Sequence, residues 1–583
     1  MLCYNFPCME NTEFAKIFWE IAEFLELKNE NRFRIRAYQK AARNIEALSE
    51  NLEDIYKKGG IKALEEVPGI GEGIAEKVEN IIKTGKLPQH DKLLAQFPKS
   101  FITLMGTPGL GPKTAILLYK KLKIDSLEKL KKFAKAGKLR GLPGFGAKKE
   151  ENILKGIELK ERVKGRFLIS EALAYAEPIV ESLKKLKEVD QILPAGSLRR
   201  WQETIGDIDI LVTSKNPEKV VNTFTSLPQV DRILAKGPTK SSVILKNGMQ
   251  ADVRVVEPNT FGAAAHYFTG SKQHNIEIRT LGVKKGLKIS EYGIFKGKKR
   301  IGGKEEVDVF KAVGLPFIPP ELRQGTGEIE AARKGKLPKL IELSDIRGDL
   351  QMHSKYSDGA NTIEEMVEKA KKLGYEYIAI TDHTKSTRVA GGQTEKEVLK
   401  ELAYIDKLNS KLKGFRIIKG AEVDILPDGS LDYPDSVLKE LEVVIAAIHS
   451  NFKMEKAKMT RRIIKAFQNQ YVNILSHPTG RLIGARDPYE VDMEEIIEAA
   501  KDTGTYLEIN SFPERLDLCD IHAKRAKEEG VLISIDTDAH SAIQLEYIKY
   551  GVMTARRGWL EKKDVVNAQP IDKLLKLLYA KRR

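Results

Sequence analysis

The stretch AGSLRRWQETIGDIDILVT, from Ala195 to Thr213, decides the fold of the middle of this chain. Its last part alternates acidic and apolar residues, which predicts a half-buried β-strand. In such a strand Asp207 and Asp209 share one face, while Ile208 and Ile210 lie on the other. Taken alone, two aspartates at this spacing are more often a solvated strand face than a site. The neighbouring residues therefore have to decide between the two interpretations.

A turn of small and basic residues precedes this predicted strand. Gly196 and Ser197 would let the backbone approach a triphosphate closely, and Arg199 and Arg200 are available to bind its oxygens. This turn makes the carboxylate pair more specific, and a third aspartate strengthens the pattern further.

The third aspartate lies in a predicted hairpin, SVILKNGMQADVRVVEP. Asn247 and Gly248 separate its two β-rich runs, which predicts a type I′ turn. Asp252 lies in the second strand, where it could join Asp207 and Asp209. Three carboxylates on adjacent strands would repel one another unless divalent cations lie between them. Two Mg²⁺ or Mn²⁺ ions held there would activate an attacking hydroxyl and neutralise a transferring phosphoryl group.

The charge of the chain favours a polyanionic partner. The 583 residues are enough for about four domains. They include 98 Lys and Arg against 82 Asp and Glu, a formal net charge of +16. Between residues 112 and 150 there are 12 basic and 3 acidic side chains, so the excess is concentrated. A merely soluble, lysine-rich surface is the alternative, but this concentration favours nucleic acid.

Three similar segments in the first third of the chain each contain a Pro-Gly-apolar-Gly turn. They are VPGIGEGIAEKV from Val67, TPGLGPKTAILL from Thr107 and LPGFGAKKEENI from Leu142. Each turn would leave backbone N–H groups exposed at the start of a helix, where they can hold a phosphate. The segments resemble helix-hairpin-helix motifs, which bind nucleic-acid backbone without reading sequence. Their paired glycines are the predicted DNA contacts: Gly69, Gly71, Gly109, Gly111, Gly144 and Gly146.

Beyond a polar stretch predicted as a linker, Ile318–Lys339, short apolar strands alternate with helical segments, which predicts a parallel β/α architecture. In a parallel barrel the C-terminal ends of the strands converge on one mouth. So many charged groups could not share a pocket there without metal. The strands end in residues that can bind metal, namely His383, Glu422, His449, His477, Asp538 and His540.

The first of these strands begins the run RGDLQMHSKYSDG, from Arg347 to Gly359. Alternation places Asp349, Gln351 and His353 on one face, and Asp358 follows shortly after. A neutral amide oxygen is a poorer ligand than imidazole or carboxylate, so the residues alone leave three interpretations open: a working metal site, a decayed one or no site.

The chain has 3 cysteines, Cys3, Cys8 and Cys519, and no C-x-x-C pair, so we expect a cytoplasmic location. The sequence also shows no signal peptide and no apolar run of the roughly 20 residues that a membrane-spanning helix needs.

The central residues resemble those of family X DNA polymerases. Gly196, Ser197, Arg200 and Gly206 stand with the two aspartates as in that family's nucleotidyltransferase motif, and Asp252 matches its third metal-binding aspartate. The resemblance implies a polymerase site that uses Mg²⁺ or Mn²⁺. Trp201 departs from the small residue that often follows the paired arginines.

The run HYFTGSKQHNIEIR, from His266 to Arg279, looks like the family segment that lines the incoming nucleotide and includes Gly270. By this resemblance Tyr267 and Phe268 would discriminate against a ribose 2′-OH. Asn275 and Arg279 would contact the minor-groove side of the nascent base pair.

The N-terminal region is similar to the small first domain of the same family, which holds a 5′-phosphate and in some members acts as a lyase on abasic sites. Lys77 matches the Schiff-base lysine, and Arg34 and Tyr38 match neighbouring phosphate-pocket positions. Gly73 stands where a basic residue is common.

The C-terminal half resembles the polymerase and histidinol phosphatase (PHP) family, a fold of metal-dependent phosphoesterases. The resemblance implies Zn²⁺ and/or Mn²⁺, an activated water and hydrolysis of phosphoesters. The matching ligand positions are Gln351, His353, Asp358, His383, Glu422, His449, His477, Asp538 and His540. Because the family often has His at the position of Gln351, the resemblance implies a depleted metal position there that favours Mn²⁺ over Zn²⁺.

These resemblances together predict a multidomain α+β and α/β protein. We expect a helical lyase-like domain (1–90), a helical fingers-like domain (91–162), a palm with a mixed sheet (163–260), a thumb-like subdomain (261–317), a linker (318–343) and a distorted PHP β/α barrel (344–583).

The predicted function is short-gap filling in base excision repair with 3′–5′ exonuclease activity. The expected partners are gapped or nicked DNA and dNTPs, and we expect a monomer. The alternatives are a template-independent nucleotidyltransferase fused to a small-molecule phosphatase, and a DNA-binding scaffold without catalysis.

Overall fold

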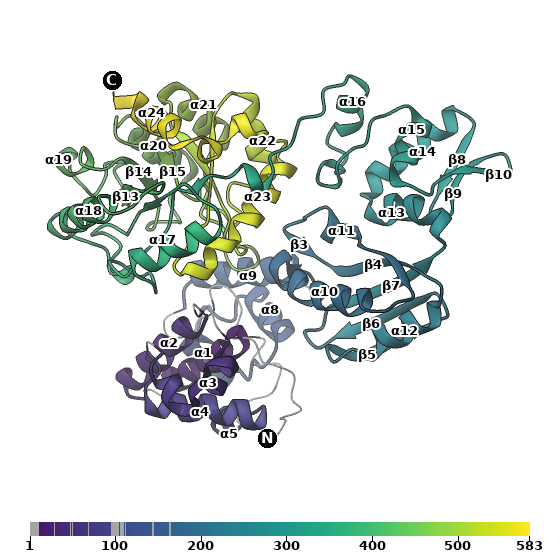
Figure 1. The fold of residues 1–583 in the computed structure, drawn as a ribbon. Helices are drawn as coiled ribbons and strands as arrows, with labels where there is room; N and C mark the ends of the chain where they lie inside the picture. Colours follow the sequence, from purple (N-terminus) through teal and green to yellow (C-terminus); the bar gives the residue numbers. More distant parts are fainter. Residues whose placement is uncertain are drawn as a thin grey trace.

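The structure is a computed structural model. It describes residues 11–27, 30–46, 48, 51–67, 69–94, 104, 110, 112–142, 145–162 and 165–582. Figure 1 shows a helical region in purple and blue, a central region built on a mixed sheet, and a C-terminal barrel in green and yellow. No helix within these ranges is both long and apolar enough to cross a membrane.

The helical region is held by one continuous apolar core, which runs from Phe14 to Ile157 and so spans both of the helical domains expected from the sequence. Its helices carry apolar residues at helical spacing, and these residues pack into the shared core. They are α1 (Asn11–Leu27), α2 (Arg32–Glu46), α3 (Leu52–Glu65), α4 (Glu72–Thr84), α5 (Pro88–Leu94), α7 (Pro112–Leu122), α8 (Leu127–Lys135) and α9 (Ala147–Arg162).

The palm is a five-stranded sheet in the order β2-β4-β7-β6-β5, in which β4 and β7 are parallel and the other pairs are antiparallel. Its strands are β2 (Val189–Pro194), β4 (Asp207–Ser214), β5 (Val230–Lys236), β6 (Lys240–Leu245) and β7 (Gln250–Val256). Around it lie α10 (Ile169–Lys184), α11 (Gly196–Arg199), α12 (Pro217–Thr225) and the small ladder of β1 (Phe167–Leu168) with β3 (Thr204–Ile205).

The hairpin between β6 and β7 forms as predicted, but its predicted turn type is wrong. Gly248 N–H donates to Leu245 O at 2.8 Å, and Gly248 alone has a left-handed φ of +89°. A type I′ turn would need Asn247 in the same region. Instead the asparagine side chain accepts from Met249 N–H at 3.1 Å, and the glycine takes the bulge position of a longer loop.

The thumb-like region packs α13 (Phe261–Thr269), α14 (Lys272–Lys284) and α15 (Glu306–Val313) against a three-stranded sheet, β8 (Leu287–Ser290), β9 (Gly293–Lys296) and β10 (Lys299–Gly302). Arg323, fully buried, donates to Glu306 at 2.6 Å. This ion pair joins the segment after residue 317 to the thumb.

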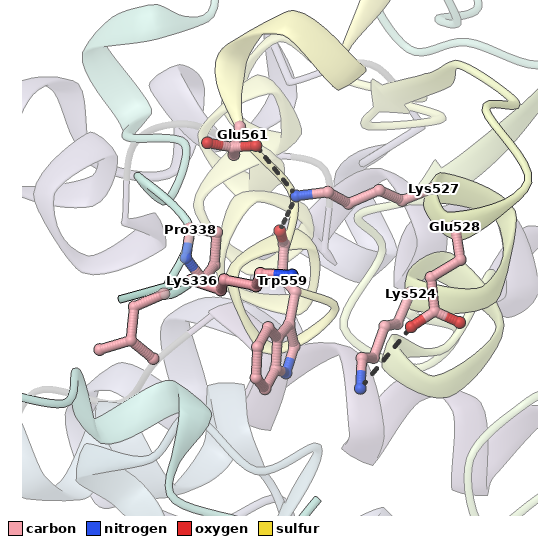
Figure 2. Close-up of a pocket in the computed structure, with 8 residues that line it drawn as sticks. Lys336, Pro338, Lys524, Lys527, Glu528, Trp559 and Glu561 are labelled. Atoms are coloured by element: carbon pink, nitrogen blue, oxygen red, sulfur yellow. Dashed lines mark hydrogen bonds and ion pairs between the residues drawn. The ribbon is translucent and has the colours of Figure 1, made fainter. Parts of the chain in front are cut away.

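The segment expected as a linker, 318–343, is itself folded. It carries the short helices η2 (Pro320–Leu322) and α16 (Glu328–Arg333), and Ile318 and Leu322 belong to the thumb core. Its later part meets the barrel at a pocket (Figure 2), where Lys336 and Pro338 face Trp559 and where Lys527 pairs with Glu561 at 3.2 Å. The segment is thus fixed at both ends.

The C-terminal half is a seven-stranded parallel sheet in sequential order, β11 to β17. A bridge between Met352, just after the first strand, and Ala539, just after the last, nearly closes the barrel. The strands are β11 (Gly348–Asp349), β12 (Tyr377–Ile380), β13 (Arg416–Asp424), β14 (Val443–Ala447), β15 (Ile474–Leu475), β16 (Tyr506–Asn510) and β17 (Ile533–Asp536).

The helices around the barrel are α17 (Ile363–Lys372), α18 (Glu395–Asn409), α19 (Asp435–Leu438), α20 (Lys456–Phe467), α21 (Met493–Thr503), α22 (Asp520–Glu528), α23 (Ile548–Arg557) and α24 (Ile571–Tyr579). Figure 1 shows α23 on the side of the barrel that faces the palm.

Candidate active sites

The three palm aspartates come together on β4 and β7. The parallel register pairs Asp209 directly with Asp252, and oxygens of Asp207, Asp209 and Asp252 all lie within 4.8 Å of one another. Burial, with the two neighbouring carboxylates, raises the pKa of Asp209 to about 6. Burial and Asp252 also raise the pKa of Asp207. Such mutual repulsion is relieved by divalent cations, which oxygen ligands prefer, so this donor set fits Mg²⁺ or Mn²⁺.

The glycine turn is built against this cluster. Gly196 has φ +61°, and a Cβ there would lie 2.8 Å from Asp209 Oδ2. Both the backbone conformation and the space therefore require glycine. Ser197 is half-buried in α11, beside the carboxylates. Gly206 has room for a larger residue, since a Cβ there would only touch Arg166 at 3.5 Å.

The two arginines of the turn differ, which corrects the expectation that both are available to a triphosphate. Arg199 donates to both oxygens of Glu306, at 2.9 and 2.6 Å, and to Thr269 Oγ1, so its guanidinium is occupied. Arg200 donates to Thr269 O, and its Nε has no partner among the described residues. Burial, with Arg323 and Arg557 nearby, lowers the pKa of Arg200 to about 10, and an anion would stabilise its charge.

The predicted nucleotide-lining residues lie at the junction of α13 and α14. Tyr267 and Phe268 pack edge to face, with ring centroids 5.1 Å apart. The guanidinium carbon of Arg254 from β7 lies 4.5 Å from the centroid of the Phe268 ring. Asn275 donates from Nδ2 to Tyr267 O at 2.7 Å, which leaves its buried Oδ1 without a partner in the described chain. Arg279 is exposed and donates to Asn275 O at 3.2 Å. Gly270 lies beside the turn, where a Cβ would approach Arg200 Nη1 to 3.1 Å.

In the helical region Lys77 is half-buried on α4 and donates to Gly73 O, with its Nζ 5.9 Å from the ring centroid of the buried Tyr38. Arg34 is exposed on α2. Gly69 is left-handed and packs on Asn44, and Gly71 begins α4 without a side-chain cap, so early N–H groups of that helix are open to a ligand. Gly146 begins α9 in the same manner, whereas Gly109, Gly111 and Gly144 lie outside the described residues.

The barrel gathers its strand-end residues around Glu422. His383 Nδ1 lies 3.0 Å from one of its oxygens, and Nε2 of His477 and of His449 lie 3.1 and 3.4 Å from the other. His353 approaches both Glu422 at 3.5 Å and Asp538 at 3.0 Å. The ligand-type atoms form overlapping groups: His353, Asp358, His383 and His540; His383, Glu422 and His449; and His353, Glu422 and Asp538.

The donor chemistry of this cluster fits divalent metal. Burial works against it, but the facing His449 and His383 hold the pKa of Glu422 well below its usual range. Burial likewise opposes the charge on His353, while Asp538 and Glu422 raise its pKa to about 9. Nδ1 of His383 and Oε2 of Glu422 lie 3.0 Å apart without hydrogen-bond geometry, and neither atom makes a hydrogen bond elsewhere in the described part of the chain. Converging lone pairs of this kind suit a shared cation, and the imidazole and carboxylate mixture suits Zn²⁺ or Mn²⁺.

Gln351, which the sequence predicts as a further metal ligand, is fully buried. Its Oε1 accepts from Ser476 Oγ at 3.0 Å, and its Nε2 has no partner among the described residues. The hydroxyl of Ser476 also lies 3.1 Å from Glu508, a neighbouring buried carboxyl. The amide oxygen of Gln351, predicted as a metal ligand, is therefore engaged in a hydrogen bond.

Two residues that hydrogen-bond to members of the cluster were not predicted from the sequence. Asp424, on the same strand as Glu422, accepts from His449 Nδ1 at 3.0 Å, and Asn510 Nδ2 donates to Asp538 at 3.0 Å. Such partners orient metal ligands. The E-x-D spacing of Glu422 and Asp424 could have indicated Asp424 from the sequence. Asn510 could have been found from its place at the end of a strand. Arg481, which follows His477 in the chain, pairs with Glu203 of the palm at 2.6 Å.

Carboxylates on adjacent strands beside a glycine turn define a metal-dependent nucleotidyltransferase, and the barrel mouth defines a metal-dependent phosphoesterase. Family models agree with both halves. The DNA polymerase beta thumb matches residues 264–324 and the PHP domain residues 349–512. A helix-hairpin-helix domain matches residues 9–87, and a SAM-like helix-hairpin-helix tandem matches 101–160.

A near full-length relative is the DNA polymerase/3′-5′ exonuclease PolX of Bacillus subtilis (strain 168), 40% identical over 97% of this chain and 98% of its own. This chain therefore belongs to the family X DNA polymerases that carry a PHP domain, as the sequence predicted. A probable phosphatase of Thermoanaerobacter sp. (strain X514) is 31% identical over 38% of this chain and 90% of its own. A probable phosphatase of Syntrophotalea carbinolica is 28% identical with the same coverage.

Proposed function

We propose that this chain is a DNA polymerase that fills short gaps during base excision repair and trims 3′ ends with its barrel. The observation that carries the proposal is the carboxylate cluster on β4 and β7, with Asp209 paired to Asp252 in register and the glycine turn packed against it. The B. subtilis relative is named as a polymerase and 3′-5′ exonuclease, and its match along almost the whole chain supports both activities.

In the palm, Asp207, Asp209 and Asp252 would hold Mg²⁺ or Mn²⁺, which supplies activation of the primer hydroxyl and charge neutralisation at the phosphoryl group. Ser197 and Arg200 bind the triphosphate of a dNTP, and Arg199 anchors the turn to Glu306 of the thumb-like region. Tyr267 and Phe268 close the sugar side against a 2′-hydroxyl. Asn275 and Arg279 contact the base pair, and the free Oδ1 of Asn275 is an acceptor for that purpose.

In the barrel, the cluster around Glu422 would hold Zn²⁺ and/or Mn²⁺, which supplies an activated water and polarises a phosphoester. Asp424 fixes the ring of His449, and Asn510 fixes Asp538. The substrate is the 3′ end of a DNA strand.

The helical region would hold the 5′ side of a gap. The open N–H groups at the starts of α4 and α9 bind backbone phosphates, and the concentrated basic charge makes this binding independent of sequence. Lys77 is the nucleophile for lyase chemistry at abasic sites. We further propose that the protein acts as a monomer in the cytoplasm on gapped or nicked DNA.

A 5′-phosphorylated gapped duplex tests the polymerase assignment. With Mn²⁺, the primer should lengthen when dNTPs are present and shorten when they are absent. Asp252→Asn should abolish extension and leave both DNA binding and shortening intact. Extension by Asp252→Asn at the normal rate would overturn the assignment of the metal site.

The second candidate is a template-independent nucleotidyltransferase joined to a small-molecule phosphatase, which the phosphatase relatives of the barrel favour. Extension with mismatched dNTPs at the rate of matched ones would support it. So would failure to digest single-stranded DNA while a small phosphate monoester is hydrolysed.

A further inference from the structure

The turn that carries Ser197 and Arg200 is held from two sides. On the thumb side, Arg199 is fixed by the paired bonds to Glu306 and by Thr269. On the other side the turn meets the barrel, through the residues that follow Arg200 in the chain. The second contact is unexpected, because the barrel contains its own active site.

Trp201 makes the central contact with the barrel. Its ring lies edge to face against Tyr550 of α23, with ring centroids 6.4 Å apart and an interplanar angle of 63°. Its carbonyl oxygen accepts from Arg557 Nη1, at the end of the same helix, at 3.1 Å. Two residues later, Glu203 pairs with both nitrogens of the Arg481 fork, at 2.6 and 3.2 Å.

The contact is buried and continuous with the palm core. Tyr550 is 6% exposed and shares one apolar cluster with Leu198 of the turn and Ile205 of β3. Leu516 from the barrel belongs to the same cluster at 2% exposure. Figure 1 shows α23 at the edge of the barrel toward β3. Buried side chains of the palm and of the barrel thus share one core, through which a displacement on one side can be passed to the other.

Trp201 also has a backbone conformation that needs support. Its φ is +53°, in the left-handed region that a bulky residue rarely adopts. Arg557 secures that conformation from the barrel by its bond to the Trp201 carbonyl, while its other arm is held by Asp520. Because Trp201 directly follows Arg200, its backbone sets where the Arg200 side chain begins.

We propose that the barrel forms part of the triphosphate site of the polymerase: Tyr550 and Arg557 are positioning residues that act through Trp201 on Arg200. The inference rests on the proposed role of this turn in dNTP binding. A side chain without a ring at position 201 would lose the edge-to-face contact with Tyr550 of α23. The carboxylates on β4 and β7 are not part of this contact, so the chemical step at saturating dNTP is unaffected.

The test is single-nucleotide incorporation on gapped DNA by the full-length chain. Tyr550→Ala should raise the KM for dNTP by about 3- to 10-fold with little change in kcat, the loss expected for one aromatic pair. Tyr550→Phe is the matched control, since it keeps the ring and should keep the KM. Exonuclease activity of Tyr550→Ala should remain, which shows that the barrel is folded.

Trp201→Asn gives a second route if Tyr550→Ala fails to fold. Asparagine tolerates the left-handed conformation, so this variant removes the ring and keeps the turn. It should raise the KM to the same degree, and the double variant should be no worse than either single variant. An unchanged KM in Trp201→Asn, or effects that multiply in the double variant, would overturn the inference.

Arg200→Ala separates this inference from the proposed function. If Arg200→Ala raises the KM for dNTP and neither Trp201→Asn nor Tyr550→Ala does, only the positioning role fails. If Arg200→Ala itself leaves the KM unchanged, the assignment of the turn to the triphosphate is wrong, and the inference falls with it.

Discussion

Asp209→Asn should have opposite effects on stability and on activity. In the metal-free protein Asp209 is buried beside two other carboxylates, and its pKa is raised from 3.8 to about 6. Because folding raises its pKa, this carboxyl makes its full contribution to stability only below pH 3.8, where it is protonated in both the folded and the unfolded protein. That contribution is lost as the pH rises through about 6. At pH 7.5 Asp209 is therefore ionised in the folded protein, and its charge lowers the free energy of unfolding by the full amount.

The size of this penalty follows from the shift. A pKa raised from 3.8 to about 6 corresponds to a loss of at most about 3 kcal/mol in the free energy of unfolding, since each tenfold change in an equilibrium constant is about 1.4 kcal/mol. Asp209 keeps part of its surface in water, so we expect a gain of roughly 1 to 3 kcal/mol in the asparagine variant. This corresponds to a rise of a few degrees in the melting temperature of the palm.

Calorimetry in EDTA at pH 7.5 measures this gain, and primer extension with Mg²⁺ measures the loss of activity. Asp190→Asn is the matched control, because it changes an exposed carboxylate on the adjacent strand β2 and should alter neither quantity. Added Mg²⁺ should stabilise the original chain but not Asp209→Asn. A variant that is less stable than the original chain in EDTA, or one that still extends primers, would refute the reasoning.

Three further changes test the other sites. Gln351→His should strengthen metal retention in the barrel, measured by metal content after dialysis, and unchanged content and nuclease activity would mean that the glutamine is neutral. Glu422→Gln removes the carboxylate that four histidines approach, so 3′–5′ digestion should fall by orders of magnitude while primer extension continues; retained digestion would place the site elsewhere. Lys77→Ala should abolish borohydride trapping on DNA with an abasic site and leave gap binding within a few-fold, and trapping that persists would identify another nucleophile.

Much of both sites could be predicted because their signals are local. Alternation along a strand places Asp207 and Asp209 on one face without any knowledge of the neighbours. The rule that parallel strands end at one mouth gathers His383, Glu422 and His449 from separate segments. The hairpin shows the limit of such local signals, since Asn247 and Gly248 predicted the reversal correctly but not the turn type.

Other features depended on partners far away in the chain. Arg199 and Arg200 are equivalent in the sequence, yet Arg199 pairs with Glu306 while Arg200 donates to Thr269 O. No pattern near Arg481 indicates that it pairs with the palm rather than with a phosphate. Ion pairs of this kind are set by which surfaces meet, and that choice comes from the packing of whole domains.

The sequence by itself determined the chemistry of this protein, because residue type and short-range spacing fix which groups can bind metal and which faces they share. Only the tertiary structure decided how the two active sites are joined. The contact of Trp201 with Tyr550 links residues 349 positions apart in number, through a shared apolar cluster that forms only when palm and barrel pack together. Burial across a domain boundary is a property of the folded surface, and no local pattern of residues encodes it.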